Sequence, residues 1–155
     1  MSFDYSEFVE FYERTVKFEA GVEQFITNLL LEVGKETYEL TKKLTPIDTR
    51  ETIDAWELSD VTRDGEYLVI TISNPLEHAS HLEDGHQQHR RFLPGAVASN
   101  GKFRYIKGHK TGIMLTNRWI PGRHMARVAI TTIQFRLPSR YQTAFDQYLS
   151  QMGMQ

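Results

Sequence analysis

Residues 22–44 read VEQFITNLLLEVGKETYELTKKL, and they predict the longest regular element of the chain. Its apolar positions recur every three to four residues, which is the spacing of one face of an amphipathic helix. At 1.5 Å per residue, a helix of about six turns is roughly 35 Å long. Pro46 ends it. The recurring positions are Val22, Phe25, Ile26, Leu29, Val33, Thr37, Leu40 and Leu44.

The preceding segment, residues 5–18, also has apolar positions at helical spacing. We interpret Ala20–Gly21 as a weak break, because glycine disfavours a helix interior. Residues 1–20 are therefore expected to form a separate helical arm with an aromatic stripe. The stripe consists of Phe8, Phe11, Tyr12 and Val16.

Short elements are predicted directly after Pro46. Residues 48–51 read DTRE, a capping box in which Asp48 accepts from the main-chain N–H of Glu51 while Glu51 reaches back to the cap. A short helix ending near Trp56 follows from this pattern.

Two β-forming segments, 57–62 and 66–74, flank Arg63–Asp64–Gly65, and this arrangement predicts a hairpin. The second segment is apolar on both alternating faces, so we expect it to be covered on both sides. One face would hold Leu68, Ile70 and Ile72, and the other Tyr67, Val69 and Thr71.

A turn at Asn74–Pro75 leads into a predicted short helix over residues 76–83, closed by Gly85. Between residues 86 and 112 the periodicity is lost. Loops of this length in compact domains are usually functional or disordered, so we predict a long, basic, mobile loop. Its glycines are Gly95, Gly101, Gly108 and Gly112.

The chain is predicted to end in a strand over residues 113–120 and two helices. The first helix begins at Pro121–Gly122 and runs to about residue 135, and the second begins at Pro138. The expected fold is a single α+β domain over residues 1–155. Its long N-terminal amphipathic helix and its C-terminal helices would pack on a small, largely antiparallel sheet.

Composition excludes several classes of protein. The chain has 155 residues and no cysteine, which excludes disulfides, thiolate metal sites and cysteine nucleophiles. Its longest apolar run, Leu29–Leu31, is far shorter than the ~20 residues that a membrane span requires. The N-terminus has no basic start and no apolar signal core, so we expect an intracellular protein without membrane contact.

Charge is distributed very unevenly along the chain. Residues 1–84 carry seven Lys/Arg and nineteen Asp/Glu, a formal charge of −12, and residues 85–155 carry eleven Lys/Arg and one acid, a charge of +10. The basic half could meet nucleic acid or the acidic half of a neighbouring copy. Alternatively, the two halves neutralise each other within one monomer.

The histidines raise the question of a metal site, because four of the six lie within twelve residues. These are His78, His81, His86 and His89, with Glu77, Glu83 and Asp84 nearby. Their spacing matches no metalloenzyme signature, and the ligands would straddle Gly85, so clustering by chance is the favoured interpretation. The sequence also lacks a nucleophile elbow and phosphate-binding loops. We therefore predict no enzymatic activity, no metal and no cofactor.

Basic and aromatic residues alternate between positions 90 and 123, as they do in surfaces that contact phosphates and stack on bases. Non-specific DNA binding by the basic region 85–145 is one hypothesis, and a solvated loop whose aromatics pack on the core is the other. The basic residues are Arg90, Arg91, Lys102, Arg104, Lys107, Lys110, Arg118 and Arg123, and the aromatics are Phe92, Phe103, Tyr105 and Trp119.

Three motifs, in this order, resemble the neck and tail-completion proteins of tailed bacteriophages. They are Thr45–Pro46–Ile47–Asp48–Thr49 with Trp56, then Asn74 with His78–Ala79 and His81–Leu82–Glu83–Asp84–Gly85–His86, then Ile120–Pro121–Gly122–Arg123–His124–Met125. The resemblance spans about residues 22–136. Two positions depart from the pattern, since Arg50 replaces a glycine and His78 replaces a tyrosine.

The resemblance implies a structural virion protein that assembles as a ring, as a hexamer or dodecamer, between the connector and the tail-tube or tail-terminator proteins. Such a protein would be assembled in the host cytoplasm and reside at the virion neck or tail terminus, where its basic loop could contact DNA in the channel. The motif residues, together with Trp119, would form interfaces. Within them, Glu83 is expected to pair with Arg123, and Gly85 to allow a left-handed helix cap.

Overall fold

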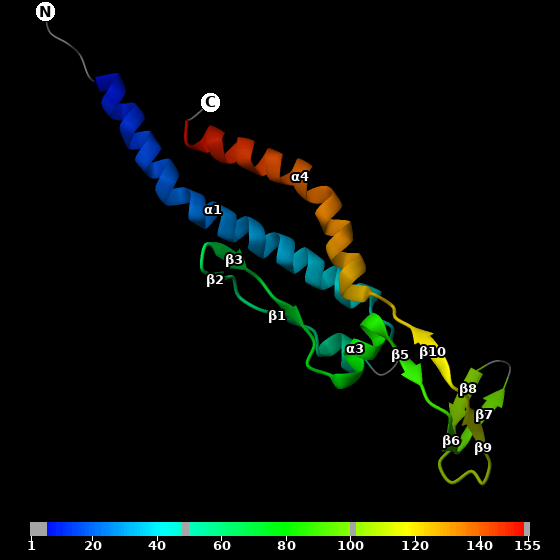
Figure 1. The fold of residues 1–155 in the computed structure, drawn as a ribbon. Helices are drawn as coiled ribbons and strands as arrows, with labels where there is room; N and C mark the ends of the chain where they lie inside the picture. The colour runs from blue at the N-terminus through cyan, green and yellow to red at the C-terminus, as the bar shows by residue number, and fades with distance from the viewer. Residues whose placement is uncertain (1–5, 48–49, 100–101, 154–155) are drawn as a thin grey trace, which may run out of the picture. The chain divides into compact units, whose positions relative to one another are not determined.

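The computed structural model describes residues 6–47, 50–99 and 102–153. Its contacts divide the chain into two compact units (Figure 1). We call Met1–Pro75 with Met125–Gln155 the helical unit, and Leu76–His124 the strand unit. Helices combine with five two-stranded antiparallel sheets, so the predicted α+β class is confirmed. No helix in the described ranges is long and apolar enough to cross a membrane.

A single helix, α1 (Ser6–Leu44), contains both segments that the sequence suggested were separate. The predicted break at Ala20–Gly21 is therefore wrong. Gly21 lies in the middle of the helix. A glycine is required there because the Cβ atom of any other residue would overlap the hydroxyl of Tyr148. The same hydroxyl donates to the carbonyl of Phe18 at 3.1 Å. Close packing of another helix thus outweighs the low helix propensity of glycine at this position.

That second helix is α4 (Met125–Gln151), which packs along α1 (Figure 1). It replaces the two predicted C-terminal helices, since Pro138 lies inside it rather than at a start. Proline has no N–H for the carbonyl four residues earlier, and α4 bends in its middle (Figure 1). Aromatic rings join the helices, with the centroid of Phe25 4.7 Å from that of Tyr148 and 6.1 Å from that of Phe145.

The core of the helical unit lies around the end of α1 and the start of α4. Buried Met125, Ala129 and Ile133 form the inner stripe of α4. Trp56 is buried as well, and its indole Nε1–H donates to the hydroxyl of Thr45 at 2.9 Å. This bond satisfies the one polar group that burial of a tryptophan would otherwise leave unpaired.

A short helix and a hairpin complete the helical unit: α2 (Glu51–Asp54), β1 (Glu57–Leu58), β2 (Thr62–Asp64), β3 (Tyr67–Val69) and β4 (Ile72–Ser73). Strand β2 pairs with β3, and β1 with β4, which confirms the predicted hairpin. Coverage on both faces was a wrong expectation, because Tyr67 is 75% exposed and Val69 36%. Only the face of Leu68, Ile70 and Ile72 is partly buried.

The strand unit contains α3 (Glu77–Asp84), β5 (Gly85–Gln88), β6 (Arg91–Pro94), β7 (Ala96–Ser99), β8 (Lys102–Tyr105), β9 (Gly112–Leu115) and β10 (Arg118–Pro121). The predicted short helix and its end at Gly85 are confirmed. The pairs β5–β10, β6–β9 and β7–β8 are nested, so the described residues between 85 and 121 form one interrupted antiparallel ribbon.

The predicted loop over residues 86–112 is therefore wrong. Its strands have only four residues each, which is too short for a pattern of alternating apolar and polar residues to be recognised. Each strand outside the innermost hairpin also pairs with a distant one, a non-local relation that local patterns do not contain. The predicted strand over residues 113–120 is divided in two, because Gln88 donates to the carbonyl of Thr116 at 2.8 Å and Asn117 accepts from the N–H of Arg90 at 2.6 Å.

We predict that Gly34→Val destabilises the helical unit by about 1–3 kcal/mol through overpacking. A Cβ at Gly34 would overlap Cδ1 of Ile70 and lie 3.3 Å from its Cγ1. Urea unfolding measures the cost. Adding Ile70→Ala should recover part of it, because the overlapping atoms are then removed.

The matched control is Lys35→Val, which places the same side chain on the neighbouring exposed position of α1. Its expected effect is within about 0.5 kcal/mol. Equal unfolding midpoints for the two valine variants would contradict close packing of α1 on Ile70.

Candidate functional site

The second and third sequence motifs meet in the strand unit. Strands β5 and β10 place Pro121 opposite Gly85 and Ile120 opposite His86. Beyond the ladder, the N–H of Arg123 donates to the carbonyl of Leu82 at 2.6 Å, and that of His124 donates to Glu83 at 3.1 Å. Two motifs some 35 residues apart are thus joined through their main chains. This pairing explains structurally why both motifs are needed at these positions.

Two glycines make this junction sterically possible. Gly85 has φ +85, and a Cβ on it would lie 2.5 Å from the carbonyl oxygen of Ile120 and 2.8 Å from the nitrogen of Gly122. A Cβ on Gly122 would lie 2.7 Å from the carbonyl carbon of Asp84. Each glycine therefore abuts the main chain of the other motif. Gly85 has the positive φ that a left-handed cap requires, but its ψ of 174 is extended, so the predicted left-handed cap is wrong and the chain passes from α3 directly into β5.

The other predicted motif residues are not all drawn into this junction. His78 is exposed on α3, and Trp119 is 59% exposed on β10. Trp56 belongs to the core of the helical unit, while Asp48 and Thr49 of the predicted capping box lie outside the described residues. Pairing of Glu83 with Arg123 remains a prediction.

Arg50, which replaces the glycine of the resembled pattern, directly precedes α2. It has φ +64, in the left-handed region that glycine adopts without cost, and it makes no side-chain capping bond. A residue with a Cβ adopts this conformation at a cost of about 1–2 kcal/mol, which a glycine would avoid.

The basic residues lie on the ribbon of the strand unit. Arg90 directly precedes β6, Arg91 is its first residue, and Arg104 is on β8; all three are exposed. Lys107 and Lys110 are exposed in the β8–β9 connection. Lys102 is also on β8, but its side chain lies outside the described set.

The uneven charge of the sequence persists in the folded units. The strand unit contains eight Lys/Arg and three Asp/Glu, a formal charge of +5, and the helical unit contains ten Lys/Arg and seventeen Asp/Glu, a charge of −7. Of the basic residues in the second half of the sequence, only Arg127, Arg136 and Arg140 belong to the acidic helical unit. The two units therefore keep opposite net charges.

The histidines cluster only in part. The ring centroids of His81 and His86 are 4.9 Å apart, and both line a cavity of about 360 Å³ together with His89 and Arg91. The Nδ1 atoms of His86 and His124 are buried and make no hydrogen bond within the described residues. No group of three His, Asp or Glu side chains among the described residues is arranged to hold a metal ion.

An apolar groove in the helical unit was not anticipated from the sequence. It has a volume of about 530 Å³ and lies between α1, the β2–β3 hairpin and α4. The sequence predicts the apolar face of α1. It does not predict that the β2–β3 hairpin and α4 leave part of this face uncovered, because that depends on how distant elements pack. Side chains that line the groove include Ile26, Leu29, Leu30, Leu68, Leu137 and Tyr141.

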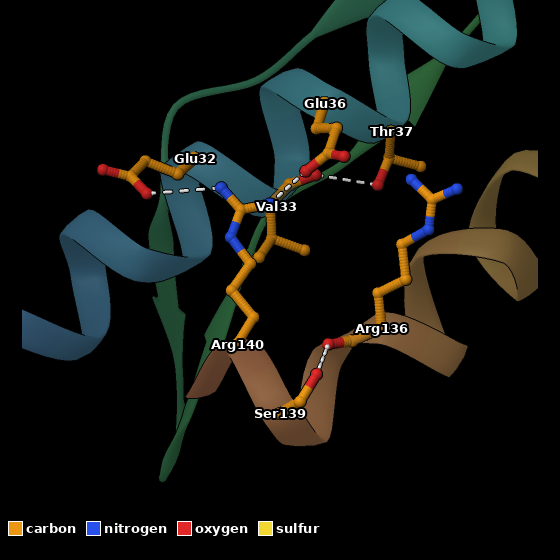
Figure 2. Close-up of polar contacts among 7 residues, drawn as sticks. All are labelled: Glu32, Val33, Glu36, Thr37, Arg136, Ser139 and Arg140. Atoms are coloured by element: carbon orange, nitrogen blue, oxygen red, sulfur yellow. Dashed lines mark hydrogen bonds and ion pairs between the residues drawn. The ribbon is translucent and has the colours of Figure 1, made fainter. Parts of the chain in front are cut away.

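Ion pairs occupy the rim of this groove. Arg140 reaches from α4 to α1, where it pairs with Glu36 and lies 3.5 Å from Glu32 (Figure 2). At the hairpin, Arg63 pairs with Glu23 on α1 at 2.6 Å. Both arginines therefore hold a neighbouring element against α1.

We predict that Arg140→Met lowers the unfolding free energy by no more than about 1 kcal/mol, because its pairs are partly solvated. The Arg140 side chain is 41% exposed. The loss should shrink as salt is raised, since screening weakens the wild-type pairs. Urea titrations at low and high ionic strength measure both effects, and a loss of several kcal/mol would contradict this assignment.

The glycine junction gives a sharper prediction. Gly85→Ala combines backbone strain with steric overlap, so we expect it to destabilise the strand unit by about 2–4 kcal/mol. Gly122→Ala introduces overlap and should cost about 1–3 kcal/mol. The fluorescence of Trp119 in a Trp56→Phe background reports unfolding of this unit alone.

Gly108→Ala is the matched control for strain. Gly108 has φ +81, but no atom lies within 4 Å of a Cβ placed there. Its cost should be about 1 kcal/mol, the strain contribution alone. If all three alanine variants unfold at the same urea concentration, the close approach of the two motifs is refuted.

Comparison with known proteins gives one positive result. No curated protein and no solved structure matches the chain. A family model described as "Bacteriophage HK97-gp10, putative tail-component" matches residues 5–85. The match covers the first motif and most of the second, whereas the third lies beyond it. It confirms the resemblance to tailed-phage proteins, and the chain belongs to the HK97-gp10-like family of bacteriophage tail components.

Proposed function

We propose that this protein is a structural component of the virion neck or tail terminus, where it forms a ring that helps to join head to tail. Membership in the tail-component family supports a virion location and contacts with other virion proteins. The observation that carries the finer proposal is the opposite charge of the two folded units, −7 and +5.

A ring requires each protomer to present two different, complementary surfaces. Neighbours in a ring meet head to tail, so the surface on one side of the protomer must fit the surface on the other side. An acidic helical unit and a basic strand unit supply such a pair, and their attraction would set orientation and accelerate association. The connector and the tail-tube or tail-terminator proteins are the expected neighbours above and below the ring.

The proposal assigns no catalytic step to this chain. The family is described by its place in the tail, and we expect the protein to act through binding surfaces alone. DNA binding by the basic ribbon gains no support from the family match. Assembly would begin in the host cytoplasm and end in the finished particle.

Electron microscopy of lysates from a strain lacking this gene tests the proposal. We expect filled heads and tails that remain separate, or tails with irregular ends, because the joining ring is missing. The kind of defect identifies the side that the protein serves. Expression of the wild-type gene from a plasmid is the control and should restore joined particles.

Normal, infectious particles in the deletion strain would contradict the proposal. Absence of the chain from purified wild-type particles, measured by mass spectrometry, would contradict it independently.

A further inference from the structure

We propose that the apolar groove of one copy receives the exposed face of the β6–β9 ladder of the next copy, and that this contact is the subunit interface of the ring. The inference rests on the proposed ring assembly. It specifies which two surfaces of the chain meet.

The groove is apolar and accessible. Its volume of about 530 Å³ is lined by side chains that remain partly solvated, with Ile26 38% and Tyr141 43% exposed. Tyr67 at the hairpin edge is 75% exposed. Partly exposed apolar side chains around one concavity mark an interaction site, because covering them releases water from apolar surface.

The edge of the groove is acidic. Glu19, Glu23 and Glu66 line it together with Arg63 and Arg140. The remaining ion partners of Arg140 are Glu32 and Glu36 (Figure 2). This set contains five carboxylates and two guanidinium groups, a formal charge of −3, so a basic occupant is favoured over an acidic one.

The β6–β9 ladder presents the complementary surface. Phe92 lies directly opposite Met114 in the register, and the two side chains are 54% and 52% exposed. A Cβ on Gly112 would lie 2.6 Å from Cζ of Phe92, so the phenyl ring covers the main chain of that glycine. Residues that lie directly opposite each other on two paired strands point to the same face of the sheet. Phe92 and Met114 therefore form one apolar projection.

Basic residues lie next to this projection along the chain. Arg90 directly precedes β6, two residues before Phe92, and Arg91 is the first residue of β6; both are exposed. Residues 85–124 contain no acidic residue. An apolar projection with a basic border matches an apolar groove with an acidic border in both polarity and sign. One chain thus has both halves of a head-to-tail contact.

A second copy explains these observations better than nucleic acid does. Phosphates would engage the arginines, but methionine offers no ring for base stacking, and half of the apolar projection would stay in water. The groove of the neighbouring copy covers both the charge and the apolar pair.

The absence of cysteine in the chain makes a direct test possible. Two single variants of the full-length protein, Ile26→Cys and Met114→Cys, are mixed and treated with a short bismaleimide. One variant carries an affinity tag, so that mixed dimers are distinguished by mass. We expect a mixed dimer, and a chain carrying both substitutions should give a ladder of linked multimers.

Phe135→Cys replaces Ile26→Cys in the control mixture. Phe135 is on α4, is 86% exposed and does not line the groove. Its yield of mixed dimer with Met114→Cys should be at least about tenfold lower, as for surfaces that meet only by collision. Circular dichroism checks that each variant keeps its helical content.

Charge reversal provides a second readout. Arg90→Glu with Arg91→Glu should reduce the yield of mixed dimer about tenfold, because like charges then face each other. Glu19→Lys with Glu66→Lys in the groove partner should restore it in part. A purely structural role of these residues would not produce such a rescue.

Several outcomes overturn the inference. Multimers in light scattering without a link between Ile26→Cys and Met114→Cys show that the ring uses other surfaces, and the proposed function then stands. Cross-links of the doubly substituted chain confined to one molecule show that the strand unit fills its own groove. No cross-link in solution or in purified particles, with loss of DNA binding in the Arg90→Glu, Arg91→Glu variant, assigns the ribbon to nucleic acid.

The opposite combination separates the two proposals. A mixed dimer formed in solution by a chain that is absent from particles supports the interface and contradicts the proposed virion role.

Discussion

The packing of α4 along α1 is the contact on which the helical unit depends. Two segments at opposite ends of the sequence meet at Gly21, where the missing side chain admits the ring of Tyr148. Burial of the aromatic rings on this seam drives the association, since transfer of apolar surface from water contributes about 25 cal/mol per Å². The strand unit is inserted in sequence between Pro75 and Met125, so the helical unit must close across that insertion.

Local patterns predicted which segments are helical, because the determinants of a helix are local, but they divided each of the two long helices into two. The apolar stripe of residues 22–44 lies within α1 as predicted, and the predicted hairpin forms with its turn at Gly65, although Arg63 and Asp64 belong to β2 and not to the connection. Gly21 and Pro138 lie inside helices, because tertiary packing there overrides the usual tendency of glycine and proline to end a helix. The nested ribbon could not be predicted, because β5 and β10 pair across some thirty residues.

The sequence predicted the residues of the candidate site as separate motifs, and the structure shows how these motifs contact each other. The sequence identified Gly85, Gly122 and Arg123 separately, and the structure joins them through the main chain of β5 and β10. It did not identify the groove, whose walls come from three elements that no periodicity connects. The uneven charge of the sequence was informative, because most basic residues of its second half belong to the strand unit.

Together these features describe a protein that acts by fitting its neighbours. The proposed head-to-tail contact is between an acidic unit with an apolar groove and a basic unit with an apolar projection. Cryo-electron microscopy of purified particles tests this account most directly. We predict a ring of this chain at the neck or tail end, with each groove occupied by the β6–β9 ladder of the adjacent copy. A complete neck and tail terminus built without this chain would contradict it.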